Sequence, residues 1–244
     1  KKGYKVTVLS LNIPATEKKI NSIKYIQADI TLLNELQEKI DFNSFEYIVN
    51  LAGYIDHSNF FNGGKKVIDA HFGGLQNILQ SLNLSRLKRF VQVGSSDEYG
   101  NSPAPQNEDM RESPISPYSL AKVSSTKLLQ MMHLTEQFPA VILRLFLVYG
   151  PDQDDGRFIP QIIQGCLSSD RFSASSGEQL RDLCYIDDVT NGILMSLKND
   201  KVDGMVINIA SGKSIRVREV IDLVQKTIGQ GSANFGEIPY RTGE

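Results

Sequence analysis

Tyr118 and Lys122 lie four residues apart in the segment SPYSLAKVSSTKLL, and together they could form a base. If this segment is helical, residues i and i+4 share a face, so the phenol and the ammonium are neighbours. A tyrosine has a pKa of about 10 and is a poor base at neutral pH. A nearby ammonium favours the phenolate, and lowering the pKa to about 7 requires roughly 4 kcal/mol of differential stabilisation. The alternative is an amphipathic tyrosine at a helix start, after Pro117 at the first position.

A second group of polar side chains precedes this helix in the string GSSDEYG. Ser95, Ser96 and Asp97 follow directly after a buried strand expected over residues 89–96. Capping or turn roles for these residues are an equal alternative when the string is taken alone. Ligands of parallel α/β sheets bind beyond the carboxyl ends of the strands, and the next helix begins beside Ser95. Tyr118 could then remove a hydroxyl proton while hydride leaves the same carbon, with Ser95 holding the oxygen.

Short apolar runs alternate with longer amphipathic segments along the chain. We expect strands over residues 4–11, 23–29, 45–53, 89–96, 140–150, 183–186 and 205–210. We expect helices over residues 31–40, 67–84, 116–138, 157–167, 187–198 and 217–228. This alternation predicts right-handed crossovers and a doubly wound, Rossmann-like α/β fold, in which helices cover both faces of a parallel sheet. A smaller, partly interleaved lobe is expected after Pro151.

Composition excludes several classes of function. Hydrophobic residues make up 41% and charged residues 22% of the chain, as in ordinary globular proteins. The net charge is −2 without a basic run, which argues against binding to nucleic acid or to a membrane surface. Cys166 and Cys184 form neither a metal pattern nor a disulfide framework, so we expect no metal and a cytoplasmic location. The longest apolar stretch is short and contains Arg144, so nothing is expected to span a bilayer.

The ordered set of motifs resembles the extended short-chain dehydrogenases that act on nucleotide sugars, the NAD-dependent epimerase/dehydratase family. The motifs are YIQADI, NLAG, FGGLQNIL, SSDEYG, SPYSLAK, LRLFLVYGP, RFIPQII, LRDLCYIDDV, NIASGKSI and IPYRTGE. The resemblance implies an enzyme that transfers hydride at C4 of a sugar, with Ser95, Tyr118 and Lys122 as its catalytic residues. It implies a dinucleotide-binding domain over residues 1–150 and a substrate-binding lobe over residues 151–244.

The resemblance also implies the residues that hold NAD(P). Asp29 and Ile30 would flank the adenine, and Tyr118 and Lys122 would also contact the cofactor. Leu51, Ala52 and Gly53 would meet its diphosphate and ribose, although small residues there also fit a tight turn after a buried strand.

Ser10 bears on the choice of cofactor. It stands near where the family often has an acidic residue that accepts from the ribose hydroxyls. Without that carboxylate a 2′-phosphate is not repelled, so NADP is favoured at least as much as NAD.

On the substrate side, the resemblance implies contacts from Ser96 and Arg157, from Arg181 to the diphosphate and from Arg241 to the nucleotide end. Two positions depart from the family pattern, because Leu147 and His71 each replace a usual asparagine. A lone histidine in such a helix is more often structural than catalytic.

Asp97 bears on which reaction follows C4 oxidation. A 4,6-dehydratase needs a further acid and base, and such enzymes usually carry Asp-Glu or Ser-Glu after the catalytic hydroxyl. Here the pair is Ser96-Asp97, one methylene shorter, and GSSDEYG looks closer to 4-keto reductases. We therefore favour a 4-keto reductase or a 4-epimerase, with dehydration as the second reading. A non-catalytic nucleotide sensor or scaffold is the alternative of another class, and the intact trio argues against it.

Family members begin with a strand, a GxxGxxG loop and a helix, and no such loop occurs in these 244 residues. The absent strand would lie centrally, and each buried backbone group left unpaired would cost about 1–3 kcal/mol. We therefore expect that the sequence is a fragment or omits segments. The strands at 4–11 and 45–53 should not pair directly, and a substitute strand or a rearranged sheet should be present.

Family members commonly pair through two long helices, so we also expect a homodimer. The corresponding segments here are residues 61–82 and 116–138. Leu128, Met131 and Met132 are candidates to face the partner, and packing of these side chains on the sheet is the alternative.

Overall fold

The computed structural model describes residues 3–168 and 171–240. The chain divides into two compact units that interleave in sequence. Unit 1 comprises residues 1–143 and 196–207, and unit 2 comprises residues 144–195 and 208–244. The assignment of dinucleotide binding and substrate binding to separate domains stays a prediction.

The central sheet has four strands in the order β3-β4-β5-β9. Its strands are β3 (Tyr47–Asn50), β4 (Arg89–Ser95), β5 (Ala140–Leu145) and β9 (Val206–Ile209). β3 and β4 run parallel, with Tyr47 opposite Arg89. The inner strands β4 and β5 are buried along almost their whole length, which explains why both read as continuous apolar runs.

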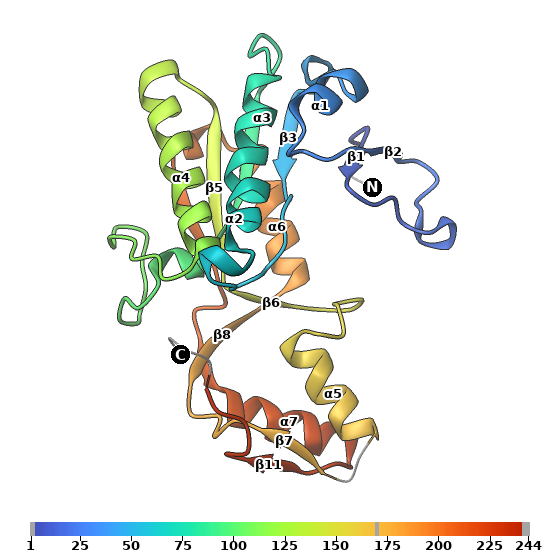
Figure 1. Ribbon diagram of the computed structural model, residues 1–244, viewed down its shortest axis with the longest axis vertical. Helices are drawn as coiled ribbons and strands as arrows, with labels where there is room; N and C mark the ends of the chain where they lie inside the picture. The colour runs from blue at the N-terminus through green and yellow to red at the C-terminus, as the bar shows by residue number, and fades with distance from the viewer. Residues whose placement is uncertain (1–2, 169–170, 241–244) are drawn as a thin grey trace. The chain divides into compact units, whose positions relative to one another are not determined.

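Helices cover one face of this sheet in unit 1. They are α1 (Leu33–Lys39), α2 (Gly64–Ile68), the π-helical turn η4 (Asp69–Gly73), α3 (Gly74–Gln80) and α4 (Pro117–Glu136). Figure 1 shows α2 and α3 end to end in one column that runs beside α4, with β5 between α3 and α4 in this view. The predicted helix over 67–84 therefore forms, but it contains a π-helical turn. Short 3-10 turns complete the unit: η1 (Thr16–Lys18), η2 (Phe42–Ser44), η3 (Phe60–Asn62), η5 (Ser96–Tyr99) and η6 (Asp200–Val202).

β1 (Thr7–Ser10) and β2 (Lys24–Gln27) form a separate two-stranded parallel sheet. As predicted, β1 and β3 do not pair directly, and Figure 1 shows the β1–β2 pair apart from β3. Of the two expected arrangements, the substitute strand is not found, because no strand of the described residues pairs with β1 other than β2, and the sheet is instead divided in two. All four residues of β1 are half-buried.

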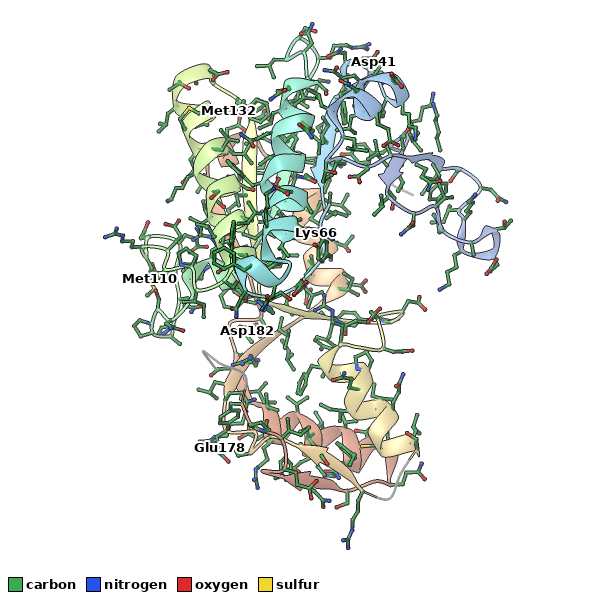
Figure 2. The ribbon with its side chains drawn as sticks, in the orientation of Figure 1. Asp41, Lys66, Met110, Met132, Glu178 and Asp182 are labelled. Carbon is green, nitrogen blue, oxygen red and sulfur yellow. The ribbon has the colours of Figure 1, made fainter. Side chains whose placement is uncertain are left out.

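One hydrophobic core joins these elements of unit 1. Its buried members are Ala28, Leu36, Phe42, Leu75, Ile78, Phe90, Leu129, Phe138, Ala140 and Ile142. Leu128 and Met132 pack against this core, and Figure 2 labels Met132 on α4. Met131 is 45% exposed. Packing on the core thus accounts for two of the three proposed dimer residues, and the dimer itself stays a prediction.

The described residues of unit 2 form two small sheets and three helices. A sheet in the order β10-β8-β6 joins β6 (Leu147–Tyr149), β8 (Leu180–Tyr185) and β10 (Ser214–Arg216). β7 (Phe172–Ala174) pairs with β11 (Ala233–Phe235), and the helices are α5 (Phe158–Ser168), α6 (Ile186–Ser196) and α7 (Val217–Ile228). α5, α7 and β7 share a core that includes Ile162, Cys166, Ala174, Val217 and Ile221.

The predicted single strand over residues 140–150 is wrong. The segment divides after Leu145 into β5 and β6, which belong to different sheets. The hydrogen-bond partners change at this point, since the Phe146 amide donates to the Ile209 carbonyl whereas residues 147–149 pair with β8. An apolar run does not reveal such a change of partner. No helix among the described residues is long and apolar enough to cross a membrane.

Gly64 offers a test of how tightly α2 packs on α4. A Cβ at this position would lie 2.5 Å from Cγ of Pro117 and 2.7 Å from the Ser58 carbonyl oxygen. We expect Gly64→Ala to lower the free energy of unfolding by about 1–3 kcal/mol, because the backbone must move apart. Gly73→Ala is the matched control, since nothing lies within 4 Å of its Cβ position. That variant should be neutral or up to about 1 kcal/mol more stable. Equal stabilities of the two variants in urea unfolding would contradict the packing interpretation.

Candidate active site

The start of α4 is fixed by its own sequence. The Ser116 hydroxyl accepts from the Ser119 amide at 3.1 Å, and the Ser119 hydroxyl accepts in return from the Ser116 amide at 2.9 Å. Pro117 occupies the first helical position, where a missing amide hydrogen is tolerated. This reciprocal cap sets Tyr118 in the first turn and Lys122 one turn later on the same face.

Ser95 ends β4 and caps η5. Its hydroxyl oxygen accepts from the Asp97 amide at 3.2 Å, and its own amide donates to Oε1 of Glu98 at 3.0 Å. The capping role considered as an alternative is therefore present. It does not exclude a chemical role, because the hydroxyl hydrogen of Ser95 is not used by this contact.

Lys122 brings a cation into the interior beside Tyr118. Its side chain is 6% exposed, its ammonium donates to the Val93 carbonyl at 2.8 Å, and the nitrogen lies 5.7 Å from the centre of the Tyr118 ring. Burial lowers the pKa of Lys122 to about 8, against the opposing pull of the carboxylates of Glu98 and Asp97. The predicted sharing of one face by the phenol and the ammonium is thus present in the structure.

Two histidines pack edge-on against the Tyr118 ring. The His71 ring lies 5.1 Å away with an interplanar angle of 82°, and the His57 ring lies 5.6 Å away at 75°. His71 is 6% exposed and its Nε2 donates to the Tyr54 carbonyl at 2.8 Å. Burial, reinforced by the charge of Lys122, lowers the pKa of His71 to about 4. His71 is therefore a neutral wall of the Tyr118 site at neutral pH.

Asp97 lies at the open side of this group. Its Oδ2 is 3.8 Å from Nε2 of His57, and both side chains are more than 40% exposed. Ser96, the neighbouring substrate candidate, is half-buried in η5. This separation exceeds the roughly 2.6–3.2 Å reach of direct proton transfer, so a proton would pass between the two groups through a water.

Sequence analysis did not single out His57 or Glu98. His57 lies in a connection between β3 and η3 without any periodicity, so no signal led to it. Glu98 had one available signal, because Ser95-x-x-Glu98 is a capping-box pattern.

The residues after β3 are arranged around His71. The Asn50 side chain donates to Oε1 of Gln92 at 2.9 Å and accepts from the Ala52 amide at 3.1 Å, which holds the turn. Gly53 has φ of +118°, and a Cβ there would lie 2.0 Å from the His71 ring. This glycine is thus required by packing against His71. The turn leaves Leu51 65% exposed, and cofactor contact by residues 51–53 stays a prediction.

The adenine candidates lie at the end of β2. Oδ1 of Asp29 accepts from the amide and the hydroxyl of Thr31 at 2.8 and 2.7 Å. Ile30 packs on Gly74, where a Cβ would come within 2.4 Å of it, and its carbonyl accepts from Asn77. Ser10 is the last residue of the parallel neighbour β1. Ser10, Asp29 and Ile30 therefore occupy the carboxyl ends of β1 and β2, as predicted for a ligand edge.

The predicted arginines belong to unit 2. Arg157 is exposed and precedes α5, and its amide donates to the Asp154 carbonyl. Arg181 lies in β8 opposite Ile215, and its guanidinium donates to the Leu180 carbonyl at 2.8 Å. The neighbouring Asp182, labelled in Figure 2, accepts from the amides of Ser211 and Gly212 and fixes that turn. Arg241 lies outside the described residues, so its prediction has no structural test.

Residues 1–210 match the family described as the NAD dependent epimerase/dehydratase family. The chain belongs to this family. The predicted family is thereby confirmed, and the mixed α/β architecture with a parallel sheet is that of its solved members.

Individual relatives share about a quarter of their residues with the chain. It is 27% identical to a UDP-glucuronate 4-epimerase of Thermodesulfobacterium geofontis, over 87% of this chain and 66% of that protein. It is 26% identical to a dTDP-D-glucose 4,6-dehydratase of Dictyostelium discoideum, over 89% of this chain and 52% of that protein. The crystal structure of UDP-glucuronic acid 4-epimerase from Bacillus cereus, with UDP-glucuronic acid and NAD, superposes with a TM-score of 0.79 at 26% identity, covering 90% of this chain and 70% of that one. The chain thus spans about half to two thirds of the length of the curated relatives it matches.

His71 makes the free energy of unfolding depend on pH below neutrality. The unfolded chain takes up this proton near pH 6.5 and the folded chain only near pH 4, so stability is full above 6.5 and falls as the pH drops. The loss should approach about 3 kcal/mol by pH 4. His71→Asn, which can still donate to a carbonyl, should lack this component in urea unfolding compared at pH 7 and pH 4.5. The half-exposed His57 provides the control variant His57→Asn, which should retain it. An identical acid response of wild type and His71→Asn would contradict the assignment.

Proposed function

We propose that the protein is an NAD(P)-dependent enzyme that transfers hydride at C4 of a nucleotide sugar, as a 4-keto reductase or a 4-epimerase. The observation that carries this proposal is the buried Lys122 ammonium beside the Tyr118 ring, next to the strand that ends in Ser95. Family membership and relatives named for UDP-glucuronate, UDP-glucose and GDP-6-deoxy-D-mannose chemistry support it. A non-catalytic sensor would have no use for a buried ammonium beside a phenol.

The three side chains take distinct roles in this proposal. Tyr118 transfers the proton of the C4 hydroxyl, and Lys122 stabilises its phenolate. Stabilisation of roughly 4 kcal/mol would bring the phenol to neutral pH, and a cation in a poorly hydrated site supplies much of it. Ser95 already accepts from Asp97 and can therefore donate its own hydrogen to the sugar oxygen.

NAD(P) supplies the hydride acceptor or donor when bound. The adenosine part is proposed to meet the Ser10 hydroxyl at the end of β1 and the Asp29 carboxylate just after the end of the neighbouring strand β2. The exposed turn after β3, residues 51–53, is the proposed contact for ribose and diphosphate. Ser10 in place of an acid is compatible with a 2′-phosphate, so NADP is proposed at least on a par with NAD. Residues Ser96, Arg157, Arg181 and Arg241 stay the proposed substrate contacts.

A 4,6-dehydratase is the second candidate, and the Asp97–His57 pair favours it. Removal of water across C5 and C6 needs an acid and a base in addition to the phenol. The pair lies 3.8 Å apart, and the His57 ring touches Tyr118. Asp97 and His57 are the proposed sources of this second acid and base.

We also propose a cytoplasmic homodimer. The two cysteines, Cys166 and Cys184, are both free, which fits a reducing compartment. On α4, Leu120, Met131 and Leu134 are 47%, 45% and 77% exposed, and they replace Leu128 and Met132 as candidate dimer residues.

Tyr118→Phe tests the proposed reaction. The full-length protein should turn over at least one of the UDP-, GDP-, CDP- and dTDP-sugars with NAD(P), measured by product mass and nicotinamide absorbance. Tyr118→Phe should reduce kcat by about 100-fold or more, because the proton-transfer group is lost. Its stability should stay within about 1 kcal/mol of wild type, since one hydroxyl is removed. Tyr25→Phe is the control, because it removes a phenol hydroxyl from β2. Near-normal turnover of Tyr118→Phe would remove this tyrosine from the mechanism.

Asp97→Asn distinguishes the two candidate reactions. A reductase or epimerase should keep most of its activity in this variant, because C4 chemistry needs only the trio. A dehydratase should stall after C4 oxidation and accumulate reduced cofactor, and His57→Gln should behave alike. The product mass of wild type decides independently, since dehydration removes one water. A dehydrated product from wild type would overturn the first choice.

A further inference from the structure

We propose that Glu98 is a positioning residue that couples Ser95 to the helix carrying Tyr118 and Lys122 and serves as the buried counter-charge of Lys122. This inference rests on the proposed function only for its effect on turnover. Its structural basis is a set of contacts within unit 1.

Glu98 joins the two elements that carry the proposed catalytic residues. Oε1 accepts from the Ser95 amide at the end of β4, at 3.0 Å. Oε2 accepts from the hydroxyl of Thr126 at 2.8 Å, and Thr126 lies in α4 one turn after Lys122. Both Glu98 and Thr126 are fully buried. The side chain thus fixes the distance between the end of β4 and the inner face of α4.

Both side-chain oxygens of Glu98 receive a hydrogen-bond donor, an arrangement that suits a carboxylate. A buried carboxylate is stable only with hydrogen-bond donors and a nearby opposite charge. Lys122 is a buried cation of the same helix face, and its pKa is raised by the charge of Glu98 against the stronger effect of burial.

Other charged groups around α4 act on Lys122 more weakly or in the opposite sense. Asp97 of η5 also raises its pKa, but Asp97 is 43% exposed and pairs with His57. His71 of η4 is neutral at neutral pH. The titratable groups of α2, Lys65 and Lys66, are exposed, and Arg89 lies at the opposite end of β4 from Ser95. Tyr118 is the neighbour on α4 itself. Glu98 is the buried carboxylate among these groups, held one turn from Lys122 by Thr126, and in this proposal it is the anion that keeps Lys122 charged.

This function goes beyond the capping of η5. A cap alone would need only the Ser95 contact, and glutamine could supply it. A counter-charge needs the negative charge itself. The isosteric Glu98→Gln separates the two roles, because it can keep both hydrogen bonds, with its amide donating to the Thr126 hydroxyl, while the charge is removed.

The test is the titration of Lys122 followed by NMR of 13C-labelled lysine, with Lys122→Met to assign the signal. We expect a midpoint near pH 8 in wild type. Glu98→Gln should move this midpoint to lower pH by about one unit, because the ammonium is no longer stabilised by a neighbouring anion. Glu112→Gln is the matched control, since Glu112 also meets α4, at Lys127, at 2.8 Å. That variant should leave the midpoint unchanged. An unshifted midpoint in Glu98→Gln would overturn the proposal.

A second measurement covers the case in which Glu98→Gln does not fold. In wild type, the carboxyl-carbon shift of Glu98 should itself change around the Lys122 midpoint, and this step should vanish in Lys122→Met. A Glu98 signal that is insensitive to Lys122 would refute the coupling.

Turnover gives the link to the reaction. Glu98→Gln should move the basic limb of the kcat profile to lower pH with little change in KM, because Lys122 loses its charge earlier. The NMR measurements need neither substrate nor cofactor. An inactive wild type with a coupled Lys122 would therefore refute the proposed function alone, and an active wild type with an uncoupled Lys122 would refute this inference alone.

Discussion

Keeping an ammonium inside the protein is the constraint on which the rest of unit 1 depends. Removing an ion from water costs several kcal/mol unless hydrogen bonds and an opposite charge compensate for it. Lys122 donates one hydrogen bond to the Val93 carbonyl of β4, the strand on which α4 packs. That contact is possible only if α4 lies directly on β4, so the helix and the strand must approach closely. The position of α4 is thus set by charge as well as by apolar packing.

Close approach explains two glycines near α4. Gly64 allows α2 to meet Pro117 at the start of α4, and Gly53 leaves room for the His71 ring. His71 in turn packs on Tyr118, which is 5% exposed. A site built in this way keeps water away from the phenol and strengthens the effect of the neighbouring cation. The same burial is what depresses the pKa values of Lys122 and His71.

Helices and strands were predictable where the apolar residues recur at a regular spacing or where a residue such as glycine marks the end of a helix. The spacing of apolar residues predicts the observed helix Val217–Ile228, which Gly229 ends in a left-handed conformation. The packing of Tyr118 and Lys122 against the strand that ends in Ser95 was predictable because strand ends and crossover helices have fixed relations in α/β sheets. His57 was not predictable, since it reaches Tyr118 through a connection whose path depends on its turns. The division of residues 140–150 also escaped prediction, because hydrogen-bond partners leave no trace in an apolar run.

The separation of the β1–β2 pair from the four-stranded sheet affects how unit 1 unfolds locally. β1 and β2 share no strand hydrogen bonds with the four-stranded sheet, and their connection runs through apolar contacts such as those of Leu9 and Ala28 with the common core. Apolar contacts are non-directional, whereas a ladder of backbone hydrogen bonds breaks as a unit. We therefore expect the β1–β2 pair of this chain to unfold as a separate cooperative segment. Its amide hydrogens should exchange with a lower free energy of opening than those of β4 and β5. A ligand that binds at the carboxyl ends of β1 and β2 should slow this local exchange at concentrations too low to change the global free energy of unfolding.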